Sequence, residues 1–229
     1  MSKIDFVLDV GGSMVNPGRI SKTFLQGFQK LIIDYIKGGK RFAIVVGGGF
    51  LTRVYQNFLR NHFTVNNYDL DAIGIRPTRL NAELVRIILK PYAYPVVLES
   101  PEAALEDAAR FSVFVFSGWK PGWSTDYVAV CIAKRFGISK VISLSNINGV
   151  YRVEDGKLEK DVILSRLRWQ DYERIIGKQW IPGMKVPFDP VATTEAKREG
   201  MEVAVMSGKD LRNIRNFFEG KSFRGTLIS

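Results

Sequence analysis

Four glycine-rich segments follow apolar stretches of the sequence, and their backbones could bind phosphate. They are Gly11-Gly12-Ser13, Gly47-Gly48-Gly49, residues 118–126 and residues 145–149. Because glycine has no Cβ, backbone N–H groups in such turns can approach an anion closely. A single turn of this kind usually indicates only a tight reversal of the chain. Four of them at one edge of a sheet predict a phosphate-rich site, although the P-loop pattern G-x-x-x-x-G-K-[ST] is absent.

The end of the third segment adds a second device for binding an anion. Ser124 or Thr125 can cap a helix that begins there, and Asp126 would lie in its first turn. A helix N-terminus directs free N–H groups and the positive end of the helix dipole toward an anion. Asp126 would otherwise be a simple capping carboxylate.

Composition excludes several classes of site. The chain has 229 residues with one cysteine, Cys131, and one histidine, His62, so a disulfide framework, a cysteine-based zinc site and a multi-histidine metal centre are excluded. Both residues are expected to be structural. The net charge of +10 is spread along the chain, which favours small phosphorylated ligands over nucleic acid.

No apolar run approaches the ~18 residues of a membrane span, and Asp9 interrupts the early apolar stretch that a signal peptide would need. We therefore expect a cytoplasmic protein without a membrane partner.

Strand and helix patterns alternate along the chain, which predicts a three-layer α/β sandwich with a mostly parallel central sheet. Ligands of such sheets bind at the carboxyl ends of the strands, where the glycine segments would lie. The predicted strands are residues 4–8, 42–46, 95–98, 111–116, 141–144, 203–206 and 226–228, with a hairpin at 151–160. The predicted helices are residues 20–36, 51–60, 81–89, 101–109, 124–136, 169–176, 190–199 and 210–218.

Together these segments resemble the amino acid kinase superfamily, and within it the archaeal-type UMP kinases. The matching segments are Asp9–Ser13, Val45–Arg53, Asp71–Ala82, Pro121–Asp126, Ser145–Tyr151, Phe188–Ala192 and Gly225-Thr226. The segment Asp71–Ala82 is the one that distinguishes UMP kinases from acetylglutamate and carbamate kinases.

The resemblance implies the amino acid kinase fold in a single domain over residues 1–229. Its acceptor (UMP) part would be about 1–140 and its ATP part about 141–229. The implied reaction transfers the γ-phosphoryl group of ATP to UMP, giving UDP for pyrimidine biosynthesis, without a covalent intermediate. Mg²⁺ would accompany ATP, held mostly by phosphates and water and not by direct side-chain ligation. The implied assembly is a homohexamer, a trimer of dimers that pack through N-terminal helices such as 20–36.

The resemblance also implies roles for individual residues. Gly12, Ser13, Arg53 and Asp126 would form the catalytic set beside the transferred phosphoryl group. The UMP-binding residues would be Gly48, Asp71, Trp119, Lys120, Pro121, Gly122, Trp123, Ser124 and Thr125. The ATP-binding residues would be Gly12, Ser13, Gly49, Arg53, Ser145, Asn146, Tyr151 and Glu154.

Plain structural alternatives stand beside several of these roles. Arg53 could lie on a solvated helix face, Asp71 could be a helix cap, and Tyr151 could simply pack. Arg79 and Asn81 are as consistent with structural or subunit-interface roles as with ligand binding.

Three positions depart from the common superfamily pattern. Asp9 stands where many members have lysine, although the archaeal branch includes other residues there, Asp among them. Thr194 stands where many members have a lysine, and Lys185 or Lys120 could supply the missing positive charge. Asn148 stands in place of an aspartate. Two alternatives therefore remain: a superfamily kinase for another small acceptor, which the bulky Trp119 and Trp123 favour, or a nucleotide-binding paralogue without turnover.

Overall fold

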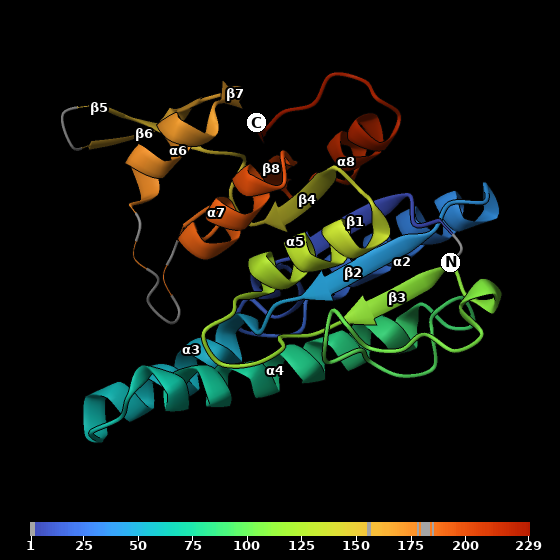
Figure 1. Ribbon diagram of the computed structural model, residues 1–229, viewed down its shortest axis with the longest axis horizontal. Coiled ribbons are helices and arrows are strands. Elements are labelled where there is room, and N and C mark those ends of the chain that lie inside the picture. The colour runs from blue at the N-terminus through green and yellow to red at the C-terminus, as the bar shows by residue number, and fades with distance from the viewer. Residues whose placement is uncertain (1–2, 155–156, 178, 180–183, 185) are drawn as a thin grey trace.

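Seven strands form one central sheet in this computed structural model, which describes residues 3–154, 157–177, 179, 184 and 186–229 (Figure 1). In sheet order the strands are β3 (Val113–Phe116), β2 (Phe42–Val46), β1 (Phe6–Val10), β4 (Lys140–Ser145), β8 (Glu202–Ser207), β9 (Thr226–Ile228) and β7 (Arg166–Leu167). The strands pair in parallel except β8 with β9. A separate antiparallel pair, β5 (Tyr151–Glu154) and β6 (Lys157–Ile163), forms the predicted hairpin.

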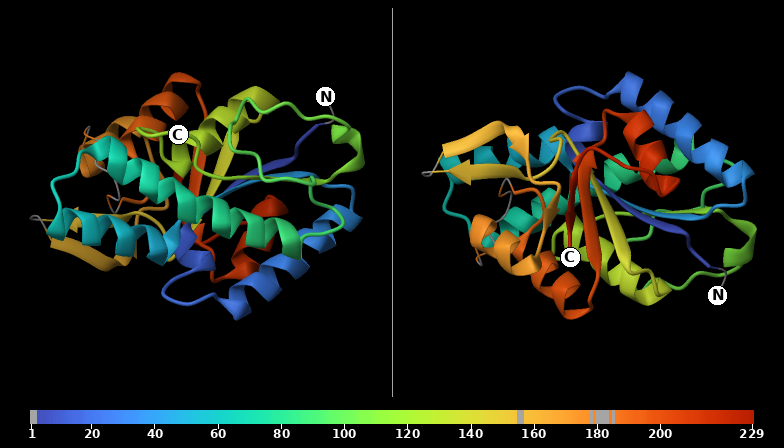
Figure 2. Two further views of the ribbon diagram at one scale, coloured as in Figure 1. Left: turned by 90° about the horizontal axis from the view of Figure 1, so that it is seen from below. Right: turned by 90° about the horizontal axis from the view of Figure 1, so that it is seen from above.

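The helices lie on both faces of the sheet (Figure 2). They are α1 (Gly12–Val15), α2 (Lys22–Lys37), α3 (Gly49–His62), α4 (Asn67–Ile88), α5 (Thr125–Phe136), α6 (Trp169–Ile176), α7 (Pro190–Arg198) and α8 (Leu211–Phe218), with the short 3-10 helix η1 (Ala108–Arg110). Both sheet faces must therefore be apolar, which is why β2 reads as a continuous apolar run with every residue buried.

Two hydrophobic cores lie on opposite faces of the sheet. Leu8 and Val10 of β1 point into the core that α2, α4 and α8 help to form, whereas Val7 points into the core beneath α5, α6 and α7. This alternation follows from the two-residue period of a strand. It leaves the carboxyl ends of the central strands as the edge that can carry polar groups.

The predicted three-layer α/β sandwich is confirmed, and three element predictions need correction. The helix expected at 81–89 is only the end of α4, which starts at Asn67 and continues through Pro77. The segment 101–109 is not a helix apart from η1. Arg135 of α5 donates hydrogen bonds to the carbonyl oxygens of Pro101 and Ala103, at 2.6 and 2.9 Å, so these groups are satisfied without helical pairing.

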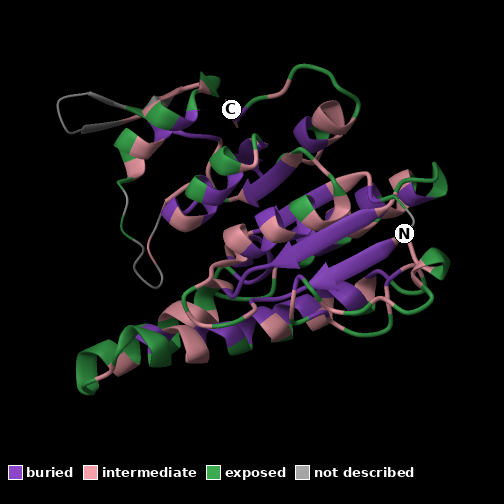
Figure 3. Ribbon diagram, viewed as in Figure 1, coloured by how far each residue is buried: buried purple, intermediate pink, exposed green. Residues whose placement is uncertain are grey.

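The segment 95–98 is also not a regular strand, since only Leu98 forms an isolated bridge there, to Phe116. In the part of the chain that the structure describes, no helix is long and apolar enough to cross a membrane. Figure 3 shows buried strands at the centre and an exposed far end of α3 and α4, which extend beyond the sheet.

Candidate active site

The glycine turns after β1 and β2 meet at the carboxyl edge of the sheet. Val10 at the end of β1 is in register with Val46 and with Leu144, so three strands end side by side. A Cβ on Gly12 would overlap the backbone nitrogen of Gly49, and Gly49 has a φ of +70°. The two turns can pack backbone to backbone only because both residues are glycine.

Helix α4 holds these turns through side chains on one of its faces. Asn81, 2% exposed, donates from Nδ2 to the carbonyl oxygens of Gly47 and Gly48 at 2.9 and 3.0 Å. Thr78 Oγ1 accepts a hydrogen bond from the backbone N–H of Gly118 at 2.8 Å. Helix α4 therefore fixes both the glycine turn and the start of the segment 118–126.

Asp71 lies on α4 about two turns before Thr78 and also holds the segment 118–126. Its Oδ2 accepts a hydrogen bond from the backbone N–H of Gly122 at 2.8 Å, which ties the segment 118–126 to α4. At the end of that segment, Ser124 Oγ accepts from the N–H of Tyr127 at 3.0 Å and caps α5. The predicted cap at Ser124 is confirmed.

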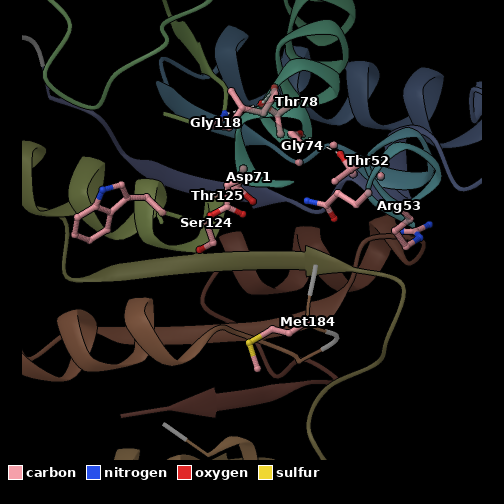
Figure 4. Close-up of a pocket in the computed structure, with 16 residues that line it drawn as sticks. Thr52, Arg53, Asp71, Gly74, Thr78, Gly118, Ser124, Thr125 and Met184 are labelled. Atoms are coloured by element: carbon pink, nitrogen blue, oxygen red, sulfur yellow. Dashed lines mark hydrogen bonds between the residues drawn. The ribbon is translucent and has the colours of Figure 1, made fainter. Parts of the chain in front are cut away.

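A cavity of about 260 Å³ lies between these turns, α3 and α4, and we call it the acceptor-side cavity (Figure 4). Glycine backbones, hydroxyl groups and one guanidinium dominate its lining. The lining residues are Gly12, Gly47, Gly48, Gly49, Thr52, Arg53, Gln56, Asp71, Gly74, Ile75, Thr78, Gly118, Trp123, Ser124, Thr125 and Met184. Such a lining offers many hydrogen-bond donors and one fixed positive charge to an anionic ligand.

A second cavity of about 680 Å³ borders the first, and we call it the loop-side cavity. Its lining is mostly apolar and comes from loops after β4 and around α6. The lining residues are Ser13, Arg53, Ser145, Asn146, Ile147, Val150, Tyr151, Ile175, Ile176, Val186 and Pro187. Arg53 lines both cavities, so a guanidinium lies where two ligands would meet.

The structure brings most of the predicted site residues to these two cavities. Of the residues predicted to bind the acceptor, the acceptor-side cavity contains Gly48, Asp71, Trp123, Ser124 and Thr125. Of those predicted to bind ATP, the loop-side cavity contains Ser13, Arg53, Ser145, Asn146 and Tyr151. Gly12 and Gly49 line the acceptor-side cavity instead.

Other predicted residues lie elsewhere. Trp119 faces a different cavity beside α5, and the Lys120 ammonium lies 4.0 Å from the ring centroid of Trp119. Pro121 and Gly122 belong to the connecting loop and line neither cavity. Glu154 ends β5, and its side chain lies outside the part of the chain that the structure describes.

Asp126 does not line either cavity but joins a cluster of three carboxyl groups beneath them. The cluster consists of Asp9 on β1, Asp126 in the first turn of α5 and Asp189, the N-cap of α7. Asp126 Oδ2 accepts the backbone N–H of Asp189 at 2.8 Å, and Ser124 Oγ donates to Asp189 Oδ2. The cluster thereby connects β1 with the N-termini of two helices.

The carboxyl groups of Asp9 and Asp126 interact, and each shifts the pKa of the other through a side-chain hydrogen bond. Burial raises the pKa of Asp9 to about 6, and burial with the charge of Asp126 raises the pKa of Asp189 to about 7. Burial and then the charge of Asp9 raise the pKa of Asp126 well above its ordinary value. One oxygen of Asp9, Oδ1, is buried without a hydrogen-bond partner among the described residues.

Sequence reasoning missed the α4 face and the apolar loop residues. Gly74 and Thr78 share one face with the predicted residue Asp71 at helical spacing, but no helix was predicted before residue 81 in this segment. The loop-side residues Ile175 and Val186 come from distant segments, and no spacing in the sequence connects them.

The positions that depart from the superfamily pattern have local partners. Thr194 Oγ1 donates to the carbonyl oxygen of Pro190 at 3.0 Å, within its own helix. The backbone N–H of Asn148 donates to the hydroxyl of Tyr151 at 3.4 Å. Lys185, suggested as a substitute cation, lies outside the described residues.

His62 is exposed, with its ring 4.9 Å from that of Phe58, and Cys131 is partly buried on α5. Neither lines the two site cavities.

The lining of the acceptor-side cavity suits phosphate oxygens. Among the described residues, no group of three histidine, cysteine, aspartate or glutamate side chains is arranged to hold a metal. The glycine backbones and Arg53 instead offer contacts to phosphate oxygens, which are the usual ligands of Mg²⁺ in phosphoryl transfer.

Known proteins share this architecture and most of the sequence length. The profile of the family described as "Amino acid kinase family" matches residues 6–207. The uridylate kinase of Methanocorpusculum labreanum is 32% identical over 225 residues, covering 97% of this chain and 94% of the relative. That of Aeropyrum pernix is also 32% identical, covering 97% of each chain.

A solved structure agrees with the sequence relatives. The crystal structure of uridylate kinase from Archaeoglobus fulgidus has a TM-score of 0.80 and 29% identity, covering 99% of this chain and 100% of that one. The family match agrees with the structure, which has glycine turns at the strand ends and two cavities that meet at Arg53. The chain is a member of the amino acid kinase family.

Proposed function

We propose that this protein is a UMP kinase, which transfers the γ-phosphoryl group of ATP to UMP and forms UDP for pyrimidine biosynthesis. The observation that carries the proposal is the pair of cavities that meet at Arg53 on the carboxyl edge of the sheet. Each could hold one nucleotide with its phosphates toward the other. The relatives at 32% identity over nearly the whole chain are uridylate kinases, which supports UMP as the acceptor.

In this proposal the protein catalyses transfer by holding the reacting groups in line. The backbones of Gly12 and Gly48 and the N-terminus of α5 would bind phosphate oxygens, and Arg53 would contact both substrates. A Mg²⁺ ion that enters with ATP would neutralise charge on its phosphates. A single proton held by the Asp9–Asp126 pair would leave one negative charge instead of two near the incoming phosphates.

We also propose that the chain has an acceptor-binding part, about 1–140, and an ATP-binding part, about 141–229. The acceptor-side cavity takes all but one of its lining residues from the first part, the exception being Met184. The loop-side cavity takes all but Ser13 and Arg53 from the second. Ser13 and Arg53 would therefore lie where the phosphoryl group passes from one ligand to the other.

One observation favours a second candidate, a kinase for another small phosphorylated acceptor. Trp123 lines the acceptor-side cavity and packs against Tyr127, with ring centroids 4.1 Å apart and the rings tilted by 30°. This bulky wall would restrict the size of the base that can enter.

The test is an assay of the purified protein with ATP, Mg²⁺ and a panel of nucleoside monophosphates, following diphosphate formation directly. The proposal expects UDP and a preference for UMP of at least tenfold. Turnover that prefers another acceptor would support the second candidate. Nucleotide binding without any product would support a paralogue that binds nucleotides without turnover.

We further propose that the protein assembles as a homohexamer, a trimer of dimers, in the cytoplasm, and that α3 and α4 form the dimer contact. The apolar face of α2, which the sequence suggested for this contact, is already buried in the core of the same chain. Helices α3 and α4 instead expose large apolar side chains. They are Phe50, Val54, Tyr55, Phe58, Tyr68, Leu80 and Ile87.

Light scattering after gel filtration tests this assembly. Phe58→Glu places a charge in the exposed apolar surface and should give smaller particles than the wild type. Val96→Glu is the matched control, because Val96 is equally exposed but lies outside α3 and α4. A wild-type monomer, or a hexamer unaffected by Phe58→Glu, would contradict the proposal.

A further inference from the structure

A groove lies at the opposite edge of the sheet from the candidate active site, and we call it the basal groove. It is bounded by the starts of β1 and β4, the end of α8 and the loop 219–225, and its volume is about 660 Å³. Figure 1 shows α8 on the side of the N-terminus, away from the arrowheads of β2, β3 and β4. The groove therefore shares no lining residue with either site cavity.

One wall of the basal groove is aromatic. Phe217 and Phe223 both line it, and their rings meet edge to face with centroids 4.8 Å apart. Both side chains are only partly buried, so apolar ring surface remains accessible in the groove. A flat aromatic ring is the ligand group that fits such a wall best.

The rest of the lining is basic. Lys3, Lys140, Arg166 and Lys221 line the groove against one acid, Asp5. Lys140 and Lys221 form ion pairs with glutamates that do not line the groove. No ion pair within the described residues involves Lys3 or Arg166.

The single acid of the lining is already neutralised. Asp5 pairs with Lys40 at 3.0 Å and accepts the backbone N–H of Arg41 at 2.9 Å. An incoming anion would therefore meet a net positive lining, in which two cations have no ion pair with another described residue. Clefts of this size, with one aromatic wall and several convergent charged groups, are typical of small-ligand sites.

We infer that the basal groove is a second ligand site, which binds a nucleoside phosphate with its base on Phe217 and Phe223 and its phosphates on Lys3, Arg166 and Lys221. A nucleoside phosphate combines the flat ring and the multiple negative charges that the two walls require. The inference does not depend on the proposed reaction. Strand β1 connects the two sites, because Phe6 lines the groove and Asp9 lies about 10 Å along the strand.

Equilibrium dialysis with labelled ADP, without Mg²⁺, tests the inference on the full chain. The double variant Arg166→Glu/Lys221→Glu should bind one ADP fewer per chain than the wild type, with at least a tenfold loss of affinity at that site. The matched control is Lys30→Glu/Lys37→Glu, which changes the charge equally on the exposed side of α2 and should bind as the wild type does. Adenosine, which lacks phosphate, should not occupy the groove.

Photolabelling of the wild type locates the site even if the double variant does not fold. With 8-azido-ADP, we expect labelled peptides from residues 137–142 or 217–223 in addition to any from the active site. Labels confined to residues 145–187, equal ADP binding by the double variant and the wild type, or adenosine binding as tight as that of ADP would each overturn the inference.

Discussion

The two cavities of the candidate active site are built in different ways. The acceptor-side cavity is fixed by hydrogen bonds from buried side chains of one helix, as Asn81 and Thr78 show. The loop-side cavity is larger and is lined mainly by apolar side chains from separate loops, such as Ile147 and Val186. In the acceptor-side cavity, the glycine turn and the segment 118–126 are held by specific hydrogen bonds. In the loop-side cavity, the apolar side chains make contacts that have no preferred direction.

This difference predicts how the two sides respond to mutation. Removal of one hydrogen-bonding side chain from α4 leaves buried backbone groups without partners, so the glycine turn itself should shift. Removal of one apolar side chain from the loop-side cavity subtracts only part of a contact surface. Acceptor binding should therefore be lost in large steps and ATP binding in small ones.

Arg53 should give the largest effect, because among the described residues it alone contributes a side-chain charge to both cavities. For Arg53→Ala we expect a fall in kcat/KM of roughly 10²–10⁴ for both substrates, by analogy with other preorganised groups at developing charge. Steady-state kinetics with each substrate varied in turn measures this. Arg60→Ala, in the last turn of α3, is the control and should change little. An effect on the kinetics of only one substrate would contradict the proposal that Arg53 contacts both substrates.

Asn81→Ala should raise the KM for the acceptor by about 10–100-fold while changing the KM for ATP much less. The reason is the loss of two hydrogen bonds to the turn at Gly47 and Gly48, each worth about 1–1.5 kcal/mol. Asn213→Ala is a matched control: Asn213 is also buried and bonds to both backbone groups of Arg224. It should lower stability similarly and leave the acceptor KM unchanged; equal KM effects would contradict a specific role for Asn81.

The acidic cluster of Asp9, Asp126 and Asp189 connects β1 with the N-termini of α5 and α7, and it should make stability depend on pH. Because the fold raises the pKa of Asp9 to about 6 and that of Asp189 to about 7, the fold favours their protonated forms. Their contribution is fully present below the unfolded value of about 3.8 and is lost as pH rises through about 6–7. We expect the free energy of unfolding in urea to fall by about 1–3 kcal/mol from pH 5 to pH 8.

The substitution Asp126→Asn tests whether the acidic cluster causes this pH dependence of stability. An amide can still donate to Asp9 but carries no charge, so the fall in stability between pH 5 and pH 8 should become smaller. Asp171→Asn is the control: an ion pair with Arg168 lowers the pKa of Asp171, so it titrates below this window. An unchanged pH profile in Asp126→Asn would show that the three carboxyl groups do not share protons.

Ile147→Ala should give the smallest effect and tests the loop side directly. The loss of part of one apolar contact, worth about 1 kcal/mol, should raise the KM for ATP about fivefold. The KM for the acceptor should not change. A loss of a hundredfold or more would mean that the loop side is as tightly specified as the acceptor side.

The sequence alone determined the fold class, the edge of the sheet where the two cavities lie and most of the glycine turns that line them. These features depend on local patterns: apolar runs that end in glycine, and a serine placed to cap a helix at Ser124. Glycine turns after parallel strands must lie at the same edge, so their meeting could be predicted without coordinates. The family resemblance added the assignment of Asp71 and Arg53 to a nucleotide site.

Only the tertiary structure decided which groups touch across the chain. The interacting carboxyl pair joins Asp9 and Asp126, which are far apart in sequence, and nothing in either local pattern indicates the other. Helix α4 continues through Pro77 because its buried face packs on the sheet and on α3, a stabilisation that local propensity does not include. Trp119, placed in the acceptor site by its neighbours in sequence, lies outside it because a loop's direction depends on its long-range hydrogen bonds, here between Gly122 and Asp71.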